Sequence, residues 1–356
     1  MSKPPDVRRR LADLPRYVPE GGRCAIDLSD NTNLWGAPPA ARAAARLEEP
    51  SIARYPDAYA GTLKEAAARY LGLPASHIVT GCGSDDVIDA AIRAFARPGA
   101  RLALPDPSFV MLPVFAHLSF LEPVPVPLTS DYDVDVDRML ASGASVVYLC
   151  SPNNPTGTSF SRAAIDTIAD RARGLVIVDE AYAEFAGRSA VDLVERSDRV
   201  LVTRTMSKAF GLAGLRVGYA AGAPSLIAQV EKVRGPFKVT SVAERAAAAA
   251  LTDDRAWVRD RVRLALENRG LFVAALRELG LEPLPSDANF VLVPVRGATG
   301  VASALRARGV AVRSFERLAC APGTPLAATS GDALRITIGP WDLLEPALAA
   351  LREVIA

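Results

Sequence analysis

The stretch Arg204-Thr-Met-Ser-Lys-Ala-Phe-Gly-Leu-Ala-Gly-Leu-Arg216 begins at the end of the apolar run Val200–Thr205 and holds a single lysine, Lys208. Such a run is typical of a buried strand, so a lysine just beyond it is partly desolvated. Burial lowers the pKa of an ammonium group, and Lys208 could then be the free amine that imine formation requires. An isolated Ser-Lys pair at a strand end is more often a surface lysine. Ser207 and Arg216 favour the functional interpretation, because together they could hold an anion beside the lysine.

Upstream of this stretch, further short apolar runs alternate with amphipathic segments. The runs are His77–Gly81, Arg101–Leu104, Val146–Cys150 and Leu175–Asp179. This alternation predicts an α/β fold in which a mostly parallel sheet is covered by helices on both faces. Ligands bind such sheets at the carboxyl ends of the strands, and the polar residues discussed below follow those ends.

After about residue 240 the pattern changes to an alanine-rich helix, a long charged helix over Asp253–Leu279, and further strands. These strands are expected near Ala288–Pro294, Val310–Phe315 and Ala333–Ile338. We therefore expect two domains: a large one over residues 45–250, and a smaller α/β one built from residues 251–356 together with residues 1–44.

The composition of the 356 residues excludes several classes of protein. Lys and Arg total 41 against 40 Asp and Glu, which leaves no net field to attract nucleic acid or an anionic membrane. The four cysteines form no C-x-x-C pair and there are two histidines, so no metal site is predicted. The start of the chain lacks the apolar core of a signal peptide, and we expect a cytoplasmic protein.

The run Leu175–Asp179 ends in a carboxylate, and Tyr182 follows three residues later. A buried carboxylate is costly unless a cationic partner meets it. A protonated ring nitrogen would be such a partner, and Tyr182 could donate a hydrogen bond to an oxygen on the same ring. The alternative for Asp179 is a helix N-cap.

Two more segments follow predicted strands. Ser151-Pro-Asn-Asn-Pro-Thr-Gly157 contains turn residues that would hold the Asn154 amide rigidly, although a short form of it could be a simple polar turn. Cys82-Gly-Ser-Asp-Asp86 leads into a helix over Val87–Phe95, where backbone N–H groups at Ser84 and Asp85 could cradle an anion. Ser84 could at the same time be the helix N-cap.

Phe109 and Arg335 are the remaining candidates. Phe109, in Pro107-Ser-Phe109, could stack on a flat ring or belong to the core. Arg335, in the predicted strand Ala333–Ile338, could form a structural ion pair. As a planar guanidinium it could instead bind a carboxylate or a phosphate.

Taken in order, these segments resemble the fold-type I pyridoxal-phosphate-dependent aminotransferases (class I/II), and among them the histidinol-phosphate aminotransferase branch. The resemblance covers nearly the whole chain. It includes the segments above and also Asp30-Asn-Thr-Asn-Leu-Trp-Gly36, Arg54-Tyr-Pro-Asp57 and Ser286-Asp-Ala-Asn-Phe290.

The resemblance implies a role for each cofactor-site residue. Lys208 would form the Schiff base with pyridoxal 5'-phosphate and move protons, and Asp179 would face the pyridine nitrogen. Asn154 and Tyr182 would bond the ring oxygen, and Phe109 would stack on the ring.

By the same resemblance, Ser207, Arg216 and the backbone at Ser84 and Asp85 would hold the cofactor phosphate. Tyr55 would reach that phosphate from the neighbouring subunit, which implies a homodimer.

The resemblance also implies transamination between an amino donor, histidinol phosphate or an aromatic amino acid, and a 2-oxo acid such as 2-oxoglutarate. Arg335, Asn33 and Arg313 would contact the substrate. Decarboxylation of a phosphorylated amino acid on the same scaffold and a non-catalytic binding module are the alternatives.

The chain departs from the family pattern near the substrate end of the site. Thr32 and Leu34 stand where Glu and Pro are usual, Lys238 stands where Asn is usual, and the loop over residues 316–331 is longer. Lys238 could bind an acidic side group or face solvent, so the sequence leaves the identity of the amino substrate open.

Overall fold

The main sheet of the protein has seven strands and is mostly parallel, as the alternating pattern predicts. The computed structural model describes residues 24–46 and 53–355. The strand order is β2-β8-β7-β6-β5-β3-β4, and only β8 runs antiparallel to its neighbours in this sheet. The strands are β2 (Ile78–Gly81), β3 (Arg101–Asp106), β4 (Glu122–Pro127), β5 (Val146–Cys150), β6 (Leu175–Asp179), β7 (Val200–Thr205) and β8 (Gly218–Gly222).

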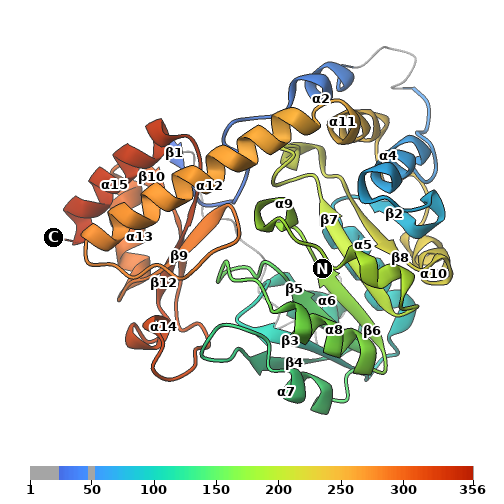
Figure 1. Cartoon of the computed structure of the whole chain (residues 1–356), viewed down its shortest axis with the longest axis horizontal. Coiled ribbons are helices and arrows are strands. Elements are labelled where there is room, and N and C mark those ends of the chain that lie inside the picture. The colour runs from blue at the N-terminus through green and yellow to red at the C-terminus, as the bar shows by residue number, and fades with distance from the viewer. Residues whose placement is uncertain (1–23, 47–52, 356) are drawn as a thin grey trace, which may run out of the picture.

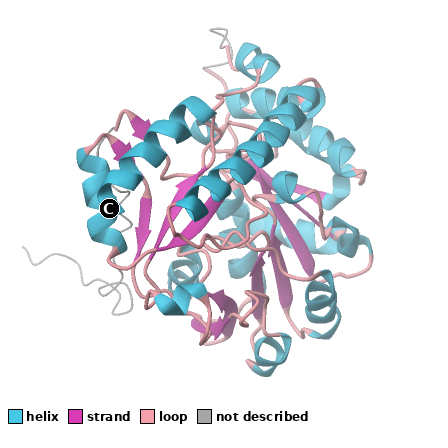
Figure 2. Ribbon diagram, turned by 60° about the vertical axis from the view of Figure 1, so that its left-hand side comes forward, coloured by secondary structure: helices cyan, strands magenta, loops and turns pink. Residues whose placement is uncertain are grey.

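Helices pack on both faces of this sheet (Figures 1 and 2). One face is covered by α5 (Ser84–Phe95), α6 (Met111–Leu118) and α10 (Pro224–Arg234). The other is covered by α4 (Gly61–Leu71), α7 (Val136–Ala141), α8 (Arg162–Arg171) and α11 (Ser241–Thr252), with α2 (Pro39–Ala44) packed on α11. Apolar side chains on both faces of the strands are buried against these helices, so the sheet lies at the centre of this larger unit.

A smaller α/β unit lies beside the main sheet, with its own apolar core. Its three-stranded antiparallel sheet has the order β11-β12-β9, and β1 pairs with β10 in a separate parallel ladder. The elements are β1 (Ile26–Asp27), β9 (Phe290–Pro294), α13 (Ala298–Ala307), β10 (Val310–Ala311), β11 (Arg313–Phe315), α14 (Pro325–Ala328), β12 (Ala333–Thr337) and α15 (Trp341–Ile355).

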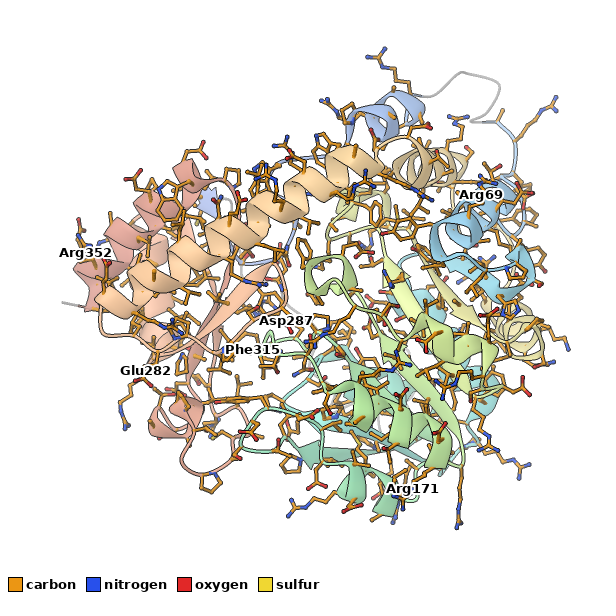
Figure 3. The ribbon with its side chains drawn as sticks, in the orientation of Figure 1. Arg69, Arg171, Glu282, Asp287, Phe315 and Arg352 are labelled. Atoms are coloured by element: carbon orange, nitrogen blue, oxygen red, sulfur yellow. The ribbon has the colours of Figure 1, made fainter. Side chains whose placement is uncertain are left out.

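The long helix α12 (Arg255–Glu278) runs from the α11 side of the main sheet across to the smaller unit (Figure 1). In Figure 3, Arg69, Arg171 and Arg352 lie at the periphery, whereas Asp287 and Phe315 lie between the smaller unit and the main sheet. None of the helices in the described ranges combines the length and apolar content that a membrane crossing needs.

Three local features differ from the prediction. The predicted strand Val310–Phe315 is divided between β10 and β11, which belong to different sheets. Helix α5 begins at Ser84, and Gly83 is its N-cap without a side-chain cap, so Ser84 is not the N-cap. The loop over residues 316–331 contains the short helix α14.

Candidate active site

A cavity of about 500 Å³ lies at the carboxyl ends of the central strands and is closed on one side by the smaller unit. Its volume falls within the ~300–1,000 Å³ typical of small-molecule sites. Eleven of the thirteen residues that the sequence singles out line it. They are Ser84, Asp85, Phe109, Asn154, Asp179, Tyr182, Ser207, Lys208, Arg216, Arg313 and Arg335.

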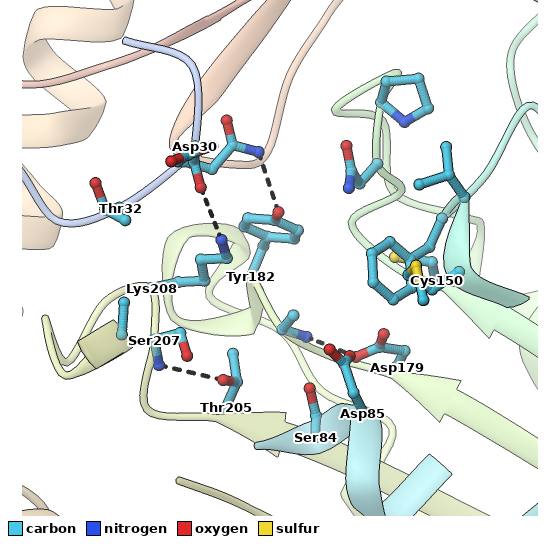
Figure 4. Close-up of a pocket in the computed structure, with 18 of the residues that line it drawn as sticks. Asp30, Thr32, Ser84, Asp85, Cys150, Asp179, Tyr182, Thr205, Ser207 and Lys208 are labelled. Carbon is cyan, nitrogen blue, oxygen red and sulfur yellow. Dashed lines mark hydrogen bonds between the residues drawn. The ribbon is translucent and has the colours of Figure 1, made fainter. Parts of the chain in front are cut away.

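Lys208 extends into this cavity from the segment after β7 (Figure 4). Its Nζ donates a hydrogen bond of 3.0 Å to the carbonyl oxygen of Asp30 and lies 5.8 Å from the centre of the Tyr182 ring. Burial, followed by the positive charge of Arg335, lowers the pKa of Lys208 to about 8. Near neutral pH this amine is still mostly charged, but its unprotonated fraction, the form a nucleophile requires, is far larger than that of an ordinary lysine.

Asp179, at the end of β6, is a buried carboxylate with only 4% of its surface exposed. Three donors bond to it: the Tyr148 hydroxyl at 2.7 Å, the Thr203 hydroxyl at 3.0 Å and the Ala181 N–H at 3.2 Å. Burial raises its pKa to about 6, and the Tyr148 and Thr203 bonds oppose that rise. The bond from the Ala181 N–H belongs to a local turn, because Ala181 lies two residues after Asp179. The next helix, α9 (Ala183–Ala186), has Tyr182 as its N-cap. Asp179 is therefore not the N-cap of α9.

Tyr182 and Asn154 are held by side chains from other parts of the chain. The Tyr182 hydroxyl accepts a 3.1 Å hydrogen bond from the Asn31 amide, and burial raises its pKa well above the ordinary value. The Asn154 side-chain oxygen accepts a 2.7 Å bond from Arg335. Because that oxygen is engaged, the NH₂ group of Asn154 is the part of the side chain suited to donate to a ligand.

The start of α5, Ser207 and Arg216 form a cradle for an anion. Arg216 has a left-handed backbone (φ 50°), and its Nη1 bonds the carbonyl oxygen of Ala213 at 3.1 Å and the Ser207 hydroxyl at 3.5 Å. A Cβ at Gly83, which has φ 83°, would lie 2.8 Å from Nη2 of Arg216. Glycine at 83 therefore lets the guanidinium approach the helix N-terminus, where backbone N–H groups and the helix dipole favour a negative charge.

The smaller unit contributes Arg335 and Arg313, which are register partners on β12 and β11. The Arg335 guanidinium donates to the Ser29 carbonyl at 2.6 Å as well as to Asn154. It also lies 5.6 and 5.7 Å from the ring centres of Phe290 and Phe315. Its orientation is thereby fixed, as recognition of a carboxylate or phosphate requires.

Tyr55 and Asn33 do not line the cavity. Tyr55 is 83% exposed and stacks on Phe237 with ring centres 4.8 Å apart. The Asn33 amide donates to the carbonyl oxygen of Ala209 at 2.8 Å, so it supports the backbone just after Lys208. Its side chain lines a much smaller neighbouring cavity.

Four residues around the site were not singled out by the sequence patterns: Asp30, Asn31, Tyr148 and Thr203. Asp30 acts through its backbone carbonyl, which leaves no signal in residue type. Tyr148 did carry a signal, because a tyrosine inside the buried run Val146–Cys150 needs a partner for its hydroxyl. The apolar pattern identified the strand but not that partner.

The fold and cavity together are typical of an α/β transferase that binds an anionic cofactor beside a reactive amine. The model of the family described as aminotransferase class I and II matches residues 24–351, and the chain belongs to this family. The resemblance carried by the sequence motifs is thus confirmed.

Relatives and solved structures agree with this assignment. Histidinol-phosphate aminotransferase from Methylibium petroleiphilum is 37% identical over 360 residues, which cover 98% of this chain and 95% of the relative. Aromatic amino acid aminotransferase from Corynebacterium glutamicum is 35% identical, with 95% and 99% covered. The crystal structure of histidinol-phosphate aminotransferase from Sinorhizobium meliloti in complex with pyridoxal-5'-phosphate superposes with a TM-score of 0.85 at 27% identity, with 98% and 97% covered.

Proposed function

We propose that the protein is a pyridoxal-phosphate-dependent transaminase whose amino donor is histidinol phosphate or an aromatic amino acid and whose acceptor is a 2-oxo acid. The observation that carries this proposal is the convergence of Lys208, Asp179 and Arg216 on one cavity. A desolvated amine, a buried carboxylate and an anion cradle are three different chemical requirements, and this cofactor needs all three. Neither decarboxylation nor a binding module without chemistry is favoured by the names of the relatives.

The residues present fit pyridoxal phosphate. Its phosphate would be held by Arg216, Ser207 and the N-terminus of α5 at Ser84 and Asp85, where Gly83 leaves space for the guanidinium. The pKa of Asp85 is raised by burial, which the charges of Arg216 and Lys208 oppose. The charged side chains that act on Asp85 are thus both positive, which suits this part of the cavity to an anion.

Four residues that line the cavity would hold the ring: Phe109 would contact its face, Asp179 its nitrogen, and Asn154 and Tyr182 its oxygen. Bound pyridoxal phosphate supplies a reactive carbonyl and a ring that accepts electrons. With the cofactor bound, Lys208 would provide the amine for that carbonyl, and its Nζ would take up and return the proton removed from the donor. Asp179 would hold the ring nitrogen in its charged form.

The substrate would meet the two arginines of the smaller unit. Arg335 is held by its bonds to Asn154 and Ser29 and would present its remaining N–H groups to a carboxylate or a phosphate, and Arg313 lies beside it in the adjacent strand. The named relatives act on histidinol phosphate or aromatic amino acids, and a 2-oxo acid such as 2-oxoglutarate carries the carboxylate that the same arginine would accept in the second half of the reaction.

A single-turnover experiment tests the proposed function. The purified protein, loaded with pyridoxal phosphate, is mixed in turn with histidinol phosphate, phenylalanine, tyrosine and aspartate, and the visible absorbance of the bound cofactor is followed. We expect loss of the yellow band with conversion to pyridoxamine phosphate for one of the first three. Release of carbon dioxide without pyridoxamine phosphate would contradict transamination, and failure to take up the cofactor would contradict the enzyme assignment as a whole.

We further propose a homodimer in which Tyr55 reaches the phosphate of the neighbouring site. Its 83% exposure and its stacking on the half-exposed Phe237 support this, since the two rings together leave the Tyr55 side chain accessible to a neighbouring subunit. Lys238, next to Phe237, forms an ion pair with Asp86 at 3.4 Å, which engages its charge near the start of α5.

The cytoplasmic location and the division into residues 45–250 and 1–44 with 251–356 stay predictions. The separate apolar core of the smaller unit supports the division.

Tyr55→Phe should weaken binding of pyridoxal phosphate by about 10-fold, the effect of losing one hydrogen bond to a charged group. Tyr59→Phe is the matched control on the same loop. In hybrid dimers of Tyr55→Phe with Lys208→Ala, the site that keeps Lys208 should regain wild-type affinity, because its tyrosine comes from the partner. Weak binding in that hybrid site, or a monomer in sedimentation equilibrium of the loaded enzyme, would contradict the arrangement.

A further inference from the structure

The environment of Asp179 contains more hydrogen-bond donors than its place in the proposed cofactor site explains. Tyr148 lies on β5 and Thr203 on β7, the strands on either side of β6, and both are fully buried. Tyr148 bonds one oxygen of the carboxylate, Oδ2, at 2.7 Å. Thr203 bonds the other, Oδ1, at 3.0 Å, and the N–H of Ala181 shares that second oxygen. The carboxylate is therefore held from both sides by its neighbouring strands.

The three hydrogen bonds leave the Asp179 carboxylate with about one acceptor position. An ionised carboxylate offers about four lone-pair positions. Three are used by the three donors named above, so about one is left for a fourth donor on the side where Asp179 lines the cavity. An ionised carboxylate accepts hydrogen bonds and cannot donate them, so the remaining position suits a cationic N–H donor.

We propose that Tyr148 and Thr203 are positioning residues that keep the Asp179 carboxylate ionised and turned toward the cavity, so that one acceptor position is presented to the ring nitrogen of the cofactor. This inference rests on the proposed function. It assigns the charge state of Asp179 to two hydroxyl groups on neighbouring strands, and neither Tyr148 nor Thr203 lines the cavity.

The electrostatics agree with the geometry. Burial raises the pKa of Asp179 to about 6, and hydrogen bonds from Tyr148 and Thr203 favour the charged form and lower it. The titratable groups that also face this carboxylate are Asp85 from α5, Cys150 from β5 and Tyr182 after β6. The pKa values of Cys150 and Tyr182 are raised far enough by burial that both stay neutral across the working range, and Asp85 adds a repulsion that raises the pKa of Asp179.

Loss of the Tyr148 hydroxyl should shift the pH dependence of catalysis toward higher pH. Because the Tyr148 bond stabilises the charged carboxylate, its removal raises the pKa of Asp179 still further. At a given pH less of the carboxylate is ionised, so catalysis is lost first on the acid side and returns as the pH rises. Losing one hydrogen bond to a charged group moves such a midpoint by roughly one pH unit, which equals about a tenfold change in the ratio of charged to neutral form.

Tyr148→Phe tests the proposal in the loaded enzyme. We expect the acid-side midpoint of kcat to rise by about one pH unit, with kcat about 10-fold below wild type on that side, KM for the donor little changed, and the two enzymes converging at high pH. Thr203→Val should act in the same direction, and Thr203→Ser, which keeps the hydroxyl, should restore the wild-type profile. Thermal unfolding of each variant is followed to show that the fold is intact.

Tyr219→Phe is the matched control. Tyr219 is fully buried in the same sheet, on β8, and its hydroxyl makes no hydrogen bond with the described residues. Its removal should leave the kcat profile unchanged. If Tyr148→Phe has a wild-type profile, or loses kcat equally at every pH, the proposal is wrong. These outcomes differ from failure of the proposed function, in which the wild-type enzyme itself would not convert its cofactor to pyridoxamine phosphate.

Discussion

Lys208→Ala is expected to abolish transamination, with kcat falling by at least ~10⁴-fold, because the variant loses both the amine that bonds the cofactor carbonyl and the proton carrier at the same position. Its Nζ reaches into the cavity between the Asp30 carbonyl and the Tyr182 ring, and among the described residues that line this cavity Lys208 alone carries an amine. Single-turnover mixing with the best donor measures the loss. Noncovalent binding of pyridoxal phosphate should persist, since Arg216 and Ser207 are untouched.

The pH dependence of cofactor uptake gives a second measurement on the same residue. Burial holds the pKa of Lys208 at about 8, below its ordinary value, so the amine is charged below this pH and free above it. The rate of covalent cofactor uptake by the empty enzyme should therefore rise as the pH passes through about 8 and then level off. Lys232→Ala, at an exposed lysine of α10, is the control and should behave as wild type. A Lys208→Ala enzyme that still turns over, or an uptake rate that is flat across this range, would exclude Lys208 as the nucleophile.

The strands that were predicted and those that were missed differ for physical reasons. The runs over β5, β6 and β7 are continuous and rich in β-branched residues, which is typical of central parallel strands, and their bounds were predicted as they occur. Strand β4 was not predicted, because Pro123, Pro125 and Pro127 interrupt the pattern of a strand. Proline is tolerated here because β4 is an edge strand.

Strand β8 was also not predicted, although it lies in the interior of the sheet. It contains only glycine, alanine and one tyrosine. A Cβ at Gly218 would lie 2.5 Å from the backbone nitrogen of Ser84. The glycine that weakens the strand pattern is thus the residue that lets β8 pass the start of α5, where the anion cradle forms. Low β-propensity at this point reflects close packing near the site, which a single-segment pattern cannot reveal.

The residues of the candidate site also divide into those that could be predicted from the sequence and those that could not. Residues at or shortly after the ends of strands, such as Asp179, Asn154 and Lys208, could be predicted because parallel strands bring their carboxyl ends together. Asn33 could not be assigned from the sequence, since whether its amide faces the cavity or the backbone of Ala209 depends on how the N-terminal segment folds back. The role of Tyr148 could not be predicted either, because its hydrogen bond to Asp179 runs between β5 and β6, and residue spacing does not encode such a contact.

Arg335→Lys should separate binding of the substrate anion from the other contacts of this side chain. Lysine keeps the positive charge but loses the planar fork, so we expect kcat/KM for histidinol phosphate to fall by about 30-fold, mostly through KM, and by ~10³-fold for Arg335→Leu. The guanidinium also donates to Asn154, so part of any loss could arise through the cofactor site. The substrate itself provides the control: histidinol lacks the phosphate ester, and its kcat/KM, which we expect to be low in the wild type, should change little in either variant. Equal losses with histidinol and histidinol phosphate would show that Arg335 acts through Asn154, and the substrate anion would then have to be assigned to Arg313.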